Sequence, residues 1–114
     1  MNSMLKEKLN SLVSIIVKTG NANEVILFGS QATGNANEYS DIDLCVISDN
    51  VTERRPVLLR SIYREISHIQ NTPVDIVLYH KNDFYERAET SNTFENRIMR
   101  EGVKLYGHRC VACD

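Results

Sequence analysis

Two aspartates separated by one residue, Asp41 and Asp43, open the apolar segment DIDLCVIS (41–48). Residues i and i+2 of a β-strand project to the same face with alpha carbons roughly 6.6 Å apart, so these carboxylates are expected side by side. Two neighbouring anions in one cleft repel each other and need a cation. Oxygen ligands without a nearby histidine or cysteine cage favour Mg²⁺, with Mn²⁺ as the alternative. Because Mg²⁺ typically also binds substrate phosphates, the pair predicts a metal-bound polyphosphate.

A Gly-Ser pair, Gly29 and Ser30, ends the apolar run 24–28 and is separated from Asp41 by ten residues. A strand that enters a glycine turn before a helical turn directs backbone N–H groups toward an anion. Gly29 lets the backbone approach closely, and the Ser30 hydroxyl can donate to a β- or γ-phosphate oxygen. An ordinary helix N-cap at Ser30 is the competing interpretation, and both roles are compatible. Together with the aspartates, the pair indicates a nucleotide-phosphate turn.

A third carboxylate, Asp75, lies within the apolar segment VDIVLY (74–79). Charge in an apolar strand is costly unless it is paired or bound to metal. In a two-metal site, with ions ~3.5–4 Å apart, one ion activates the attacking hydroxyl and the other stabilises the leaving oxygen. Asp75 would help to hold the first ion and could accept the proton of the nucleophile. The alternative is an exposed acid on an edge strand.

Hydrophobic periodicity supplies the elements that must position these residues. Helices are predicted over about 3–19, 53–70, 81–88 and 93–100. Strands are predicted over 24–28, 41–48 and 74–79, with 103–106 a small strand or a packing segment. One face of the second strand carries Ile42, Leu44 and Val46, and the other carries Asp41, Asp43 and Cys45. Residues 29–40 are predicted as loop with one helical turn after Ser30, Gly20 as a left-handed stop, and Pro56 in a first helical turn.

The chain length and composition limit the architecture and its surroundings. With 114 residues, 42% hydrophobic and 25% charged, one ordinary α/β (α+β) domain over 1–114 is expected, a small mixed β-sheet packed against helices. The net charge of −2 gives no basic field for broad nucleic-acid binding. No apolar stretch approaches the ~18 residues of a membrane span, and no secretory signal is recognisable. Three cysteines without a disulfide pattern fit a reducing, cytoplasmic location.

Several remaining residues are expected to have no part in the proposed site. Residues 109–114 are expected to form a flexible tail in which Cys110 and Cys113 are free thiols, because a structural zinc site needs four ligands. His68 and His80 have no spacing typical of metal ligands or of a catalytic base, so they are assigned no role. The arginines of the second predicted helix indicate a solvated face, with contact to an acidic partner or RNA as the alternative; they are Arg54, Arg55, Arg60 and Arg64.

The segments GSQATGNANEYSDIDL, PVDIVLY and IMREGVKLYG resemble the minimal nucleotidyltransferase (MNT) family of the DNA polymerase-beta-like superfamily. The resemblance extends over most of the chain, and the spacing from Gly-Ser to Asp-x-Asp is highly specific. It implies a nucleotidyltransferase fold, an acidic triad of Asp41, Asp43 and Asp75, and a nucleotide-phosphate turn at Gly29 and Ser30. It also implies two Mg²⁺ ions, with Mn²⁺ as the alternative, and ATP as the substrate.

Many small members of this family resemble the antitoxin halves of HEPN/MNT toxin–antitoxin pairs. Such an antitoxin transfers AMP from ATP to a tyrosine of its HEPN partner, a ribonuclease toxin, so the resemblance implies a protein adenylyltransferase. One alternative is a non-catalytic antitoxin that neutralises by binding, supported by Gln31 and Thr33 where many relatives carry arginines. The other is a small-molecule, antibiotic-type nucleotidyltransferase whose acceptor pocket forms between subunits.

Overall fold

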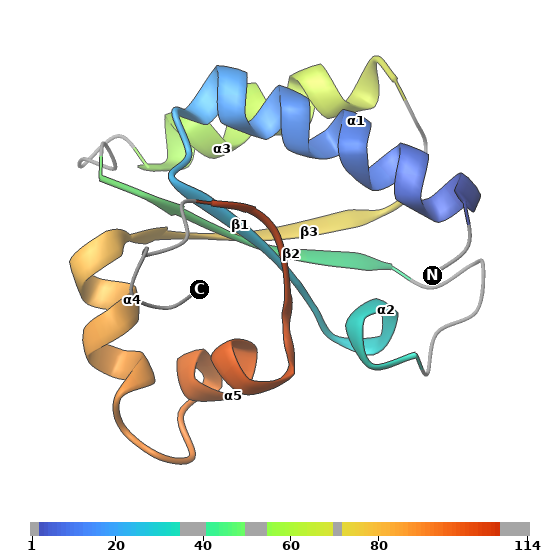
Figure 1. The fold of residues 1–114 in the computed structure, drawn as a ribbon. Helices are drawn as coiled ribbons and strands as arrows, with labels where there is room; N and C mark the ends of the chain where they lie inside the picture. Colours follow the sequence, from blue (N-terminus) through green and yellow to red (C-terminus); the bar gives the residue numbers. More distant parts are fainter. Residues whose placement is uncertain (1–2, 35–40, 50–54, 70–71, 108–114) are drawn as a thin grey trace.

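The computed structural model describes residues 3–34, 41–49, 55–69 and 72–107. Its elements, in chain order, are α1 (Ser3–Gly20), β1 (Glu24–Phe28), α2 (Ser30–Thr33), β2 (Ile42–Ser48), α3 (Arg55–Ser67), β3 (Val74–His80), α4 (Lys81–Ala88), α5 (Phe94–Glu101) and β4 (Val103–Gly107). The strands form one sheet in the order β3-β2-β1-β4, with helices on both faces (Figure 1). The predicted α/β class, a small mixed sheet packed against helices, is confirmed.

The sheet is mixed, with both parallel and antiparallel neighbours. β1 runs antiparallel to both β2 and β4, whereas β2 and β3 are parallel and are joined by the crossover that contains α3. A parallel pair needs such a crossover, while antiparallel strands can be joined by shorter connections. For the segment 103–106, the sequence allowed either a small strand or a packing segment. It is a strand, because β4 pairs with β1 at one edge of the sheet.

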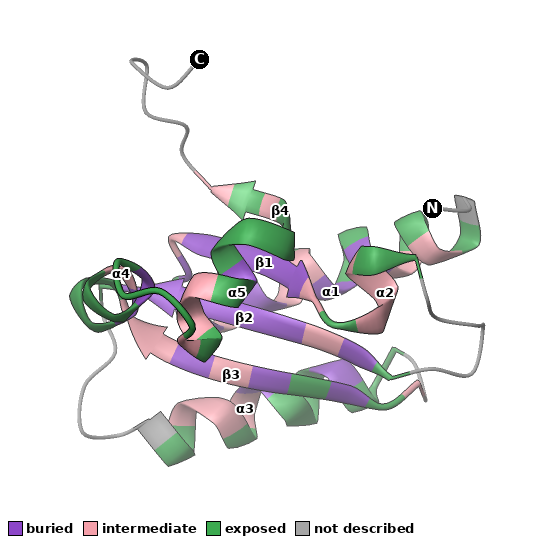
Figure 2. Ribbon diagram, turned by 90° about the horizontal axis from the view of Figure 1, so that it is seen from below, coloured by how far each residue is buried: buried purple, intermediate pink, exposed green. Residues whose placement is uncertain are grey.

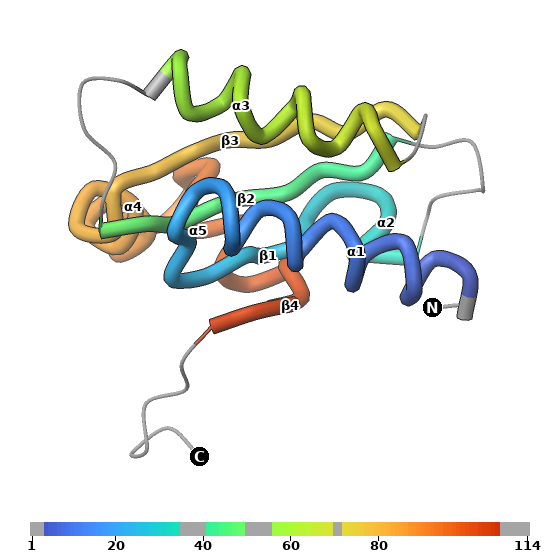
Figure 3. The backbone as a smooth tube through the Cα atoms, turned by 90° about the horizontal axis from the view of Figure 1, so that it is seen from above, coloured from blue at the N-terminus to red at the C-terminus, as the bar shows by residue number. Residues whose placement is uncertain are grey.

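One face of the sheet is covered by α1 and α3. Figure 3, seen from above, shows α1 over β1 and α3 along β3. The predicted apolar face of β2 points to these helices, where it meets the helical stripe represented by Leu12 and Ile62, both 0% exposed. Burying each such side chain stabilises the fold by about 1.5–3 kcal/mol. Arg60 and Arg64 are exposed on α3, as expected for a solvated face.

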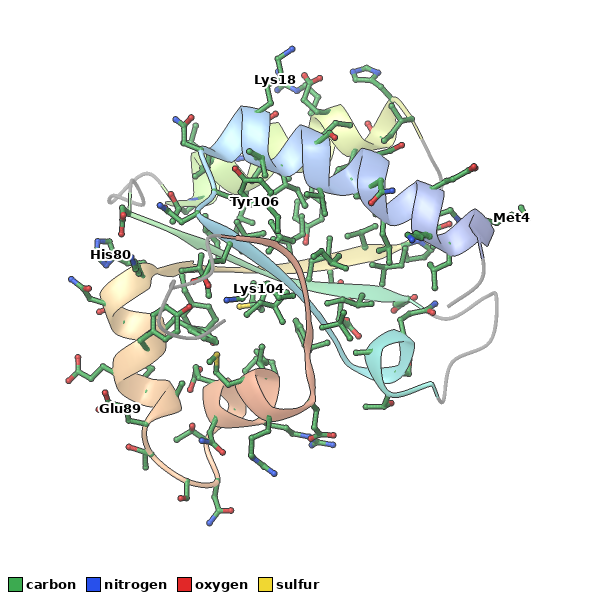
Figure 4. All side chains as sticks on the ribbon, viewed as in Figure 1. Met4, Lys18, His80, Glu89, Lys104 and Tyr106 are labelled. Carbon is green, nitrogen blue, oxygen red and sulfur yellow. The ribbon has the colours of Figure 1, made fainter. Side chains whose placement is uncertain are left out.

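The opposite face carries a second, smaller core under α4 and α5. Its buried members are Ile26, Cys45, Ile47, Phe84, Ala88 and Ile98. Polar contacts link the elements at the rim of this core. The Tyr85 hydroxyl donates to Oε2 of Glu24, and Oε1 of Glu24 lies 2.7 Å from Lys104 Nζ. Figure 4 labels Lys104 on β4. His80, to which the sequence assigned no role, is the N-cap of α4, and its Nδ1 accepts a hydrogen bond from the Asn82 N–H at 3.2 Å.

The left-handed stop expected at Gly20 is wrong. The helix continues through Gly20, and Asn21 takes the positive φ, 50°. Asparagine tolerates this conformation better than most residues. A Cβ on Gly20 would lie 3.2 Å from Cδ1 of Ile62, tighter than most Cβ contacts. Gly20 therefore serves the close packing of α1 against α3.

Other element boundaries differ from the prediction by a few residues. β2 begins at Ile42, so Asp41 precedes the strand. Helix α3 ends at Ser67 instead of continuing to residue 70, because the next N–H groups bond to carbonyls three residues back. Pro56 lies in its first turn, as predicted. Predictions for the loop 35–40, for 53–54 including Arg54, and for the tail 109–114 with Cys110 and Cys113 fall outside the described residues.

None of the helices in the described segments has the length and apolar character that a bilayer crossing requires.

The second core generates a stability prediction. Phe84 is 0% exposed and makes edge-to-face contacts with Tyr79 and Tyr85, so Phe84→Ala leaves a cavity and removes both contacts. We expect the free energy of unfolding, measured by urea denaturation, to fall by about 3–5 kcal/mol. The control Val57→Ala, at a side chain that is 53% exposed, should change it by less than about 0.5 kcal/mol. Equal losses for the two variants would contradict a second core.

Candidate active site

Three strands place one residue each in a row across the α4 and α5 side of the sheet. Asp43 on β2 pairs with Phe28 of antiparallel β1 and with Asp75 of parallel β3. Adjacent strands lie about 4.8 Å apart, and residues paired in register present their side chains to the same face. The structure therefore brings the carboxylates of Asp43 and Asp75 together, from strands whose pairing fixes their relative position.

Burial increases along β2 with distance from this row. On β2, Asp43 is half-buried, whereas Cys45 and Ile47 are both 0% exposed in the second core. Asp75, on the neighbouring β3, is exposed. Figure 2, seen from below, shows α4 and α5 over one half of the sheet, and neither of these two helices covers the starting ends of β2 and β3. The aspartates thus lie where the second core ends and solvent reaches the sheet. Charged groups are tolerated there at a lower cost than in the core.

The turn at Gly29 packs directly against Asp43. Gly29 has φ 76° and ψ −156°, a backbone region that is essentially restricted to glycine. A Cβ at this position would collide with Oδ2 of Asp43 and would lie 3.2 Å from its Cγ. Glycine is therefore required twice, for the backbone conformation and for the close approach to the carboxylate.

The one-turn helix predicted after Ser30 is present as α2. The N–H groups of Ala32 and Thr33 donate to the Gly29 carbonyl at 3.1 and 3.2 Å. Ser30, the first helical residue, has no intrahelical acceptor for its N–H. The interpretation of Ser30 as N-cap is wrong, because the N-cap is Gly29 and no side chain in the described segments caps this helix. The turn thus offers a backbone donor and a hydroxyl beside Asp43, the groups that phosphate oxygens accept from.

Gln31 and Thr33 add no positive charge to this turn. The Thr33 hydroxyl is directed back to its own helix, 3.4 Å from the Gly29 carbonyl oxygen and 3.5 Å from that of Ser30. Gln31 is half-buried. Phosphate binding at the turn would therefore depend on the backbone, the Ser30 hydroxyl and a cation.

The surroundings of Asp43, in the middle of the row, disfavour its charged form. Burial raises the pKa of Asp43, and the negative charges of Asp75 and then Asp41 raise it further. Within the described segments, no lysine, arginine or histidine nitrogen lies within 4 Å of these three carboxylates. Uncompensated negative charge at the edge of a core is the environment in which a bound cation is most stabilising.

Asp41 lies one residue before β2 and is exposed, close enough to Asp43 to influence its pKa. Among the residues that the structure places, no three histidine, cysteine, aspartate or glutamate side chains converge into a ready-made metal site. The donor chemistry nevertheless fits a hard divalent cation, because the groups that meet are carboxylates beside a phosphate-type turn. Asp43 and Asp75 would hold such an ion, with Asp41 as the adjoining donor.

Other titratable groups on this face are unsuited to reaction. Burial raises the pKa of the Cys45 thiol, which excludes a reactive thiolate. Burial, followed by a hydrogen bond to a glutamate, raises the pKa values of the hydroxyls of Tyr79 and Tyr85. Both hydroxyls donate to glutamates at the rim of the second core, so neither is positioned as an acceptor at the aspartate row.

Two aromatic residues beside the row were not selected by sequence reasoning. Phe28 pairs with Asp43, and its ring meets that of Phe94 edge to face, with centroids 5.5 Å apart. The position of Phe28 directly before Gly29 was a usable signal. Phe94 carried none, because only the packing of α5 against β1 brings it to this place.

Comparisons with known proteins bear on the family and the fold of the chain. The profile of the nucleotidyltransferase domain family matches residues 4–105. A protein from Methanocaldococcus jannaschii, named "Putative protein adenylyltransferase MJ1305", is 45% identical over 65 residues, covering 47% of this chain and 44% of that protein. The match thus spans less than half the length of this relative. The crystal structure of a "putative nucleotidyltransferase" from Sulfolobus solfataricus matches with a TM-score of 0.55 at 17% identity, over 95% of this chain and 90% of the other, a likeness of fold alone.

The contact between Gly29 and Asp43 generates a paired prediction. Gly29→Ala combines backbone strain with a clash against Asp43, and should lower the free energy of unfolding by about 2–4 kcal/mol. Gly34→Ala has a similar φ, 82°, but no described atom lies within 4 Å of its added Cβ, so about 1–2 kcal/mol is expected. Urea denaturation of both variants measures the difference. A Gly34→Ala loss as large as that of Gly29→Ala would show that the clash does not exist.

The raised pKa of Asp43 generates a pH prediction. The Asp43 carboxyl binds its proton more tightly in the folded state than in the unfolded state. Protonated Asp43 therefore contributes to stability at low pH, and this contribution is lost as the pH rises through the folded-state pKa. Asp43→Asn should therefore stabilise the protein at pH 7, by about 1 kcal/mol or less given solvent screening. The gain should vanish near ~pH 3, where Asp43 is protonated in both states. Thermal unfolding in EDTA tests this, and a variant that is less stable than the parent at pH 7 would refute it.

Proposed function

Since the chain belongs to the nucleotidyltransferase domain family, we propose that it is a metal-dependent protein adenylyltransferase. It transfers AMP from ATP to a tyrosine hydroxyl of a partner protein. The observation that carries this proposal is the row of Asp43 and Asp75 on neighbouring strands, with the Gly29 turn packed against Asp43. This arrangement supplies a phosphate-binding turn and paired carboxylates within one open part of the sheet.

In the proposed reaction, the tyrosine oxygen attacks the α-phosphorus of ATP. A new oxygen–phosphorus bond forms, the bond from the α-phosphorus to the α,β-bridging oxygen breaks, and pyrophosphate leaves with that electron pair. The hydroxyl proton passes to the carboxylate of Asp75, which is exposed and can release it to solvent. The products are pyrophosphate and a tyrosine that carries AMP through a phosphodiester.

The residues of the chain contribute positioning and charge. Gly29 and Ser30 donate hydrogen bonds to the β- and γ-phosphates, while Asp41, Asp43 and Asp75 would hold two Mg²⁺ or Mn²⁺ ions. When bound, these ions supply neutralisation of the triphosphate and activation of the attacking hydroxyl. The pKa of Asp43, raised by burial and by its two acidic neighbours, is expected to fall when a cation binds beside it.

For the partner we propose a HEPN-domain ribonuclease toxin that this chain silences as its antitoxin. Support comes from the resemblance of the site segments to antitoxins of HEPN/MNT pairs and from the name of the Methanocaldococcus jannaschii relative, a protein adenylyltransferase.

The test combines the chain with a candidate HEPN partner from the same organism, ATP and Mg²⁺. Intact-mass spectrometry should show the partner gaining whole AMP units on tyrosine, with loss of its ribonuclease activity. Asp43→Asn should slow the modification on the order of a hundredfold or more, because positioned charge stabilisation is lost. The matched control Asp83→Asn, at an exposed aspartate on α4 away from the row, should modify the partner at the parental rate.

Two outcomes would replace the proposal. If the partner is silenced without a change in mass, and equally well by Asp43→Asn, the chain acts by occlusion. If the partner is neither bound nor modified while a small hydroxylated compound receives AMP, the chain is a small-molecule nucleotidyltransferase.

A further inference from the structure

Phe94 is a large apolar side chain that stands at the edge of the candidate site and is 48% exposed. Its ring meets the Phe28 ring at 83° with centroids 5.5 Å apart. Phe28 is the residue paired with Asp43 on the neighbouring strand. Phe94 is thus separated from the aspartate row by about one strand spacing, roughly 4.8 Å, and one ring contact.

The backbone on both sides of Phe94 is held firmly. The Thr93 hydroxyl accepts from the Asn96 N–H at 3.0 Å and lies 2.9 Å from the carbonyl oxygens of Arg87 and Thr90. Glu95 accepts a 2.6 Å hydrogen bond from the Tyr79 hydroxyl of β3. A ring on such a fixed segment is pre-organised, so a ligand that contacts it incurs little ordering cost.

The packing of α5 does not require an aromatic residue at this position. Ile98 of the same helix is 1% exposed and supplies its buried contact with the second core. Phe94 meets the Phe28 ring edge to face and leaves about half of its surface to solvent. Exposed apolar surface next to a group of polar side chains is typical of a ligand contact.

We infer that Phe94 is the stacking surface for the base of the nucleoside triphosphate. The inference rests on the proposed function: the triphosphate occupies the Gly29 turn and the aspartate row, and the sugar spans the remaining separation to the ring. A planar base is the part of this substrate that matches an exposed aromatic face. Because every base has a π-face, this contact adds affinity without discriminating strongly between bases.

The experiment compares two probes, ATP and inorganic triphosphate, each with Mg²⁺, by isothermal titration calorimetry. Phe94→Leu keeps an apolar side chain against Phe28 but removes the aromatic face. It should weaken ATP binding about tenfold and leave triphosphate binding within twofold of the parent. Met99→Ala, a control on the same helix at a residue that is 44% exposed, should change neither affinity. Asp43→Asn should weaken both probes.

A second variant provides a direct signal. The chain contains no tryptophan, so Phe94→Trp introduces a single tryptophan fluorophore at the proposed contact. Its emission should be quenched by ATP and not by inorganic triphosphate, with ATP affinity retained or improved.

Unchanged ATP affinity in Phe94→Leu, an equal loss for both probes, or a tryptophan that does not respond to ATP would overturn the inference while leaving the proposed function standing. A parental chain that binds neither probe would overturn the proposed function itself, and the stacking contact with it.

Discussion

The approach of the Gly29 backbone to the Asp43 carboxylate is the constraint on which the rest of the site depends. It joins the end of β1 to the start of β2, two strands that are antiparallel neighbours, so that a phosphate-type turn and a carboxylate share one place. Any side chain at Gly29 would occupy the position of the Asp43 oxygen, and the backbone conformation there is itself restricted to glycine. The parallel pairing of β2 with β3 then places Asp75 beside Asp43.

The two faces of the sheet divide the tasks of stability and chemistry. The face under α1 and α3 is buried along its whole length and supplies most of the apolar contacts. The other face is covered only beyond Asp43, so the same strand carries a half-buried acid and, two residues later, a fully buried cysteine. Burial and like charge raise the pKa of Asp43, which destabilises the folded state at neutral pH in the absence of a cation. This cost at a proposed site residue is offset by the two cores.

Most of the architecture could be predicted from the sequence because its elements obey simple periodicities. Helix α4 has the predicted bounds, and the apolar face of β2 points as expected to α1 and α3. An error occurred where tertiary packing overrides a local signal, since Gly20 serves close helix packing instead of a left-handed turn. The competing interpretation of Ser30 as an N-cap also fails, because Gly29 is the N-cap. The pairing of Asp43 with Asp75 depends on strand order, which short-range patterns do not encode. Phe94 could not have been found, since only the fold brings it to Phe28.

The central claim is that the triphosphate and its cation bind at Gly29, Ser30, Asp43 and Asp75. The most direct measurement is amide NMR with Mn²⁺ and a non-hydrolysable ATP analogue, since a paramagnetic ion broadens the signals of nearby residues. We expect selective loss of the Gly29, Ser30, Asp43 and Asp75 amide signals, while those of α3 on the opposite face persist. Broadening centred on α3, or uniform weak broadening without a focus on the start of β2, would contradict it.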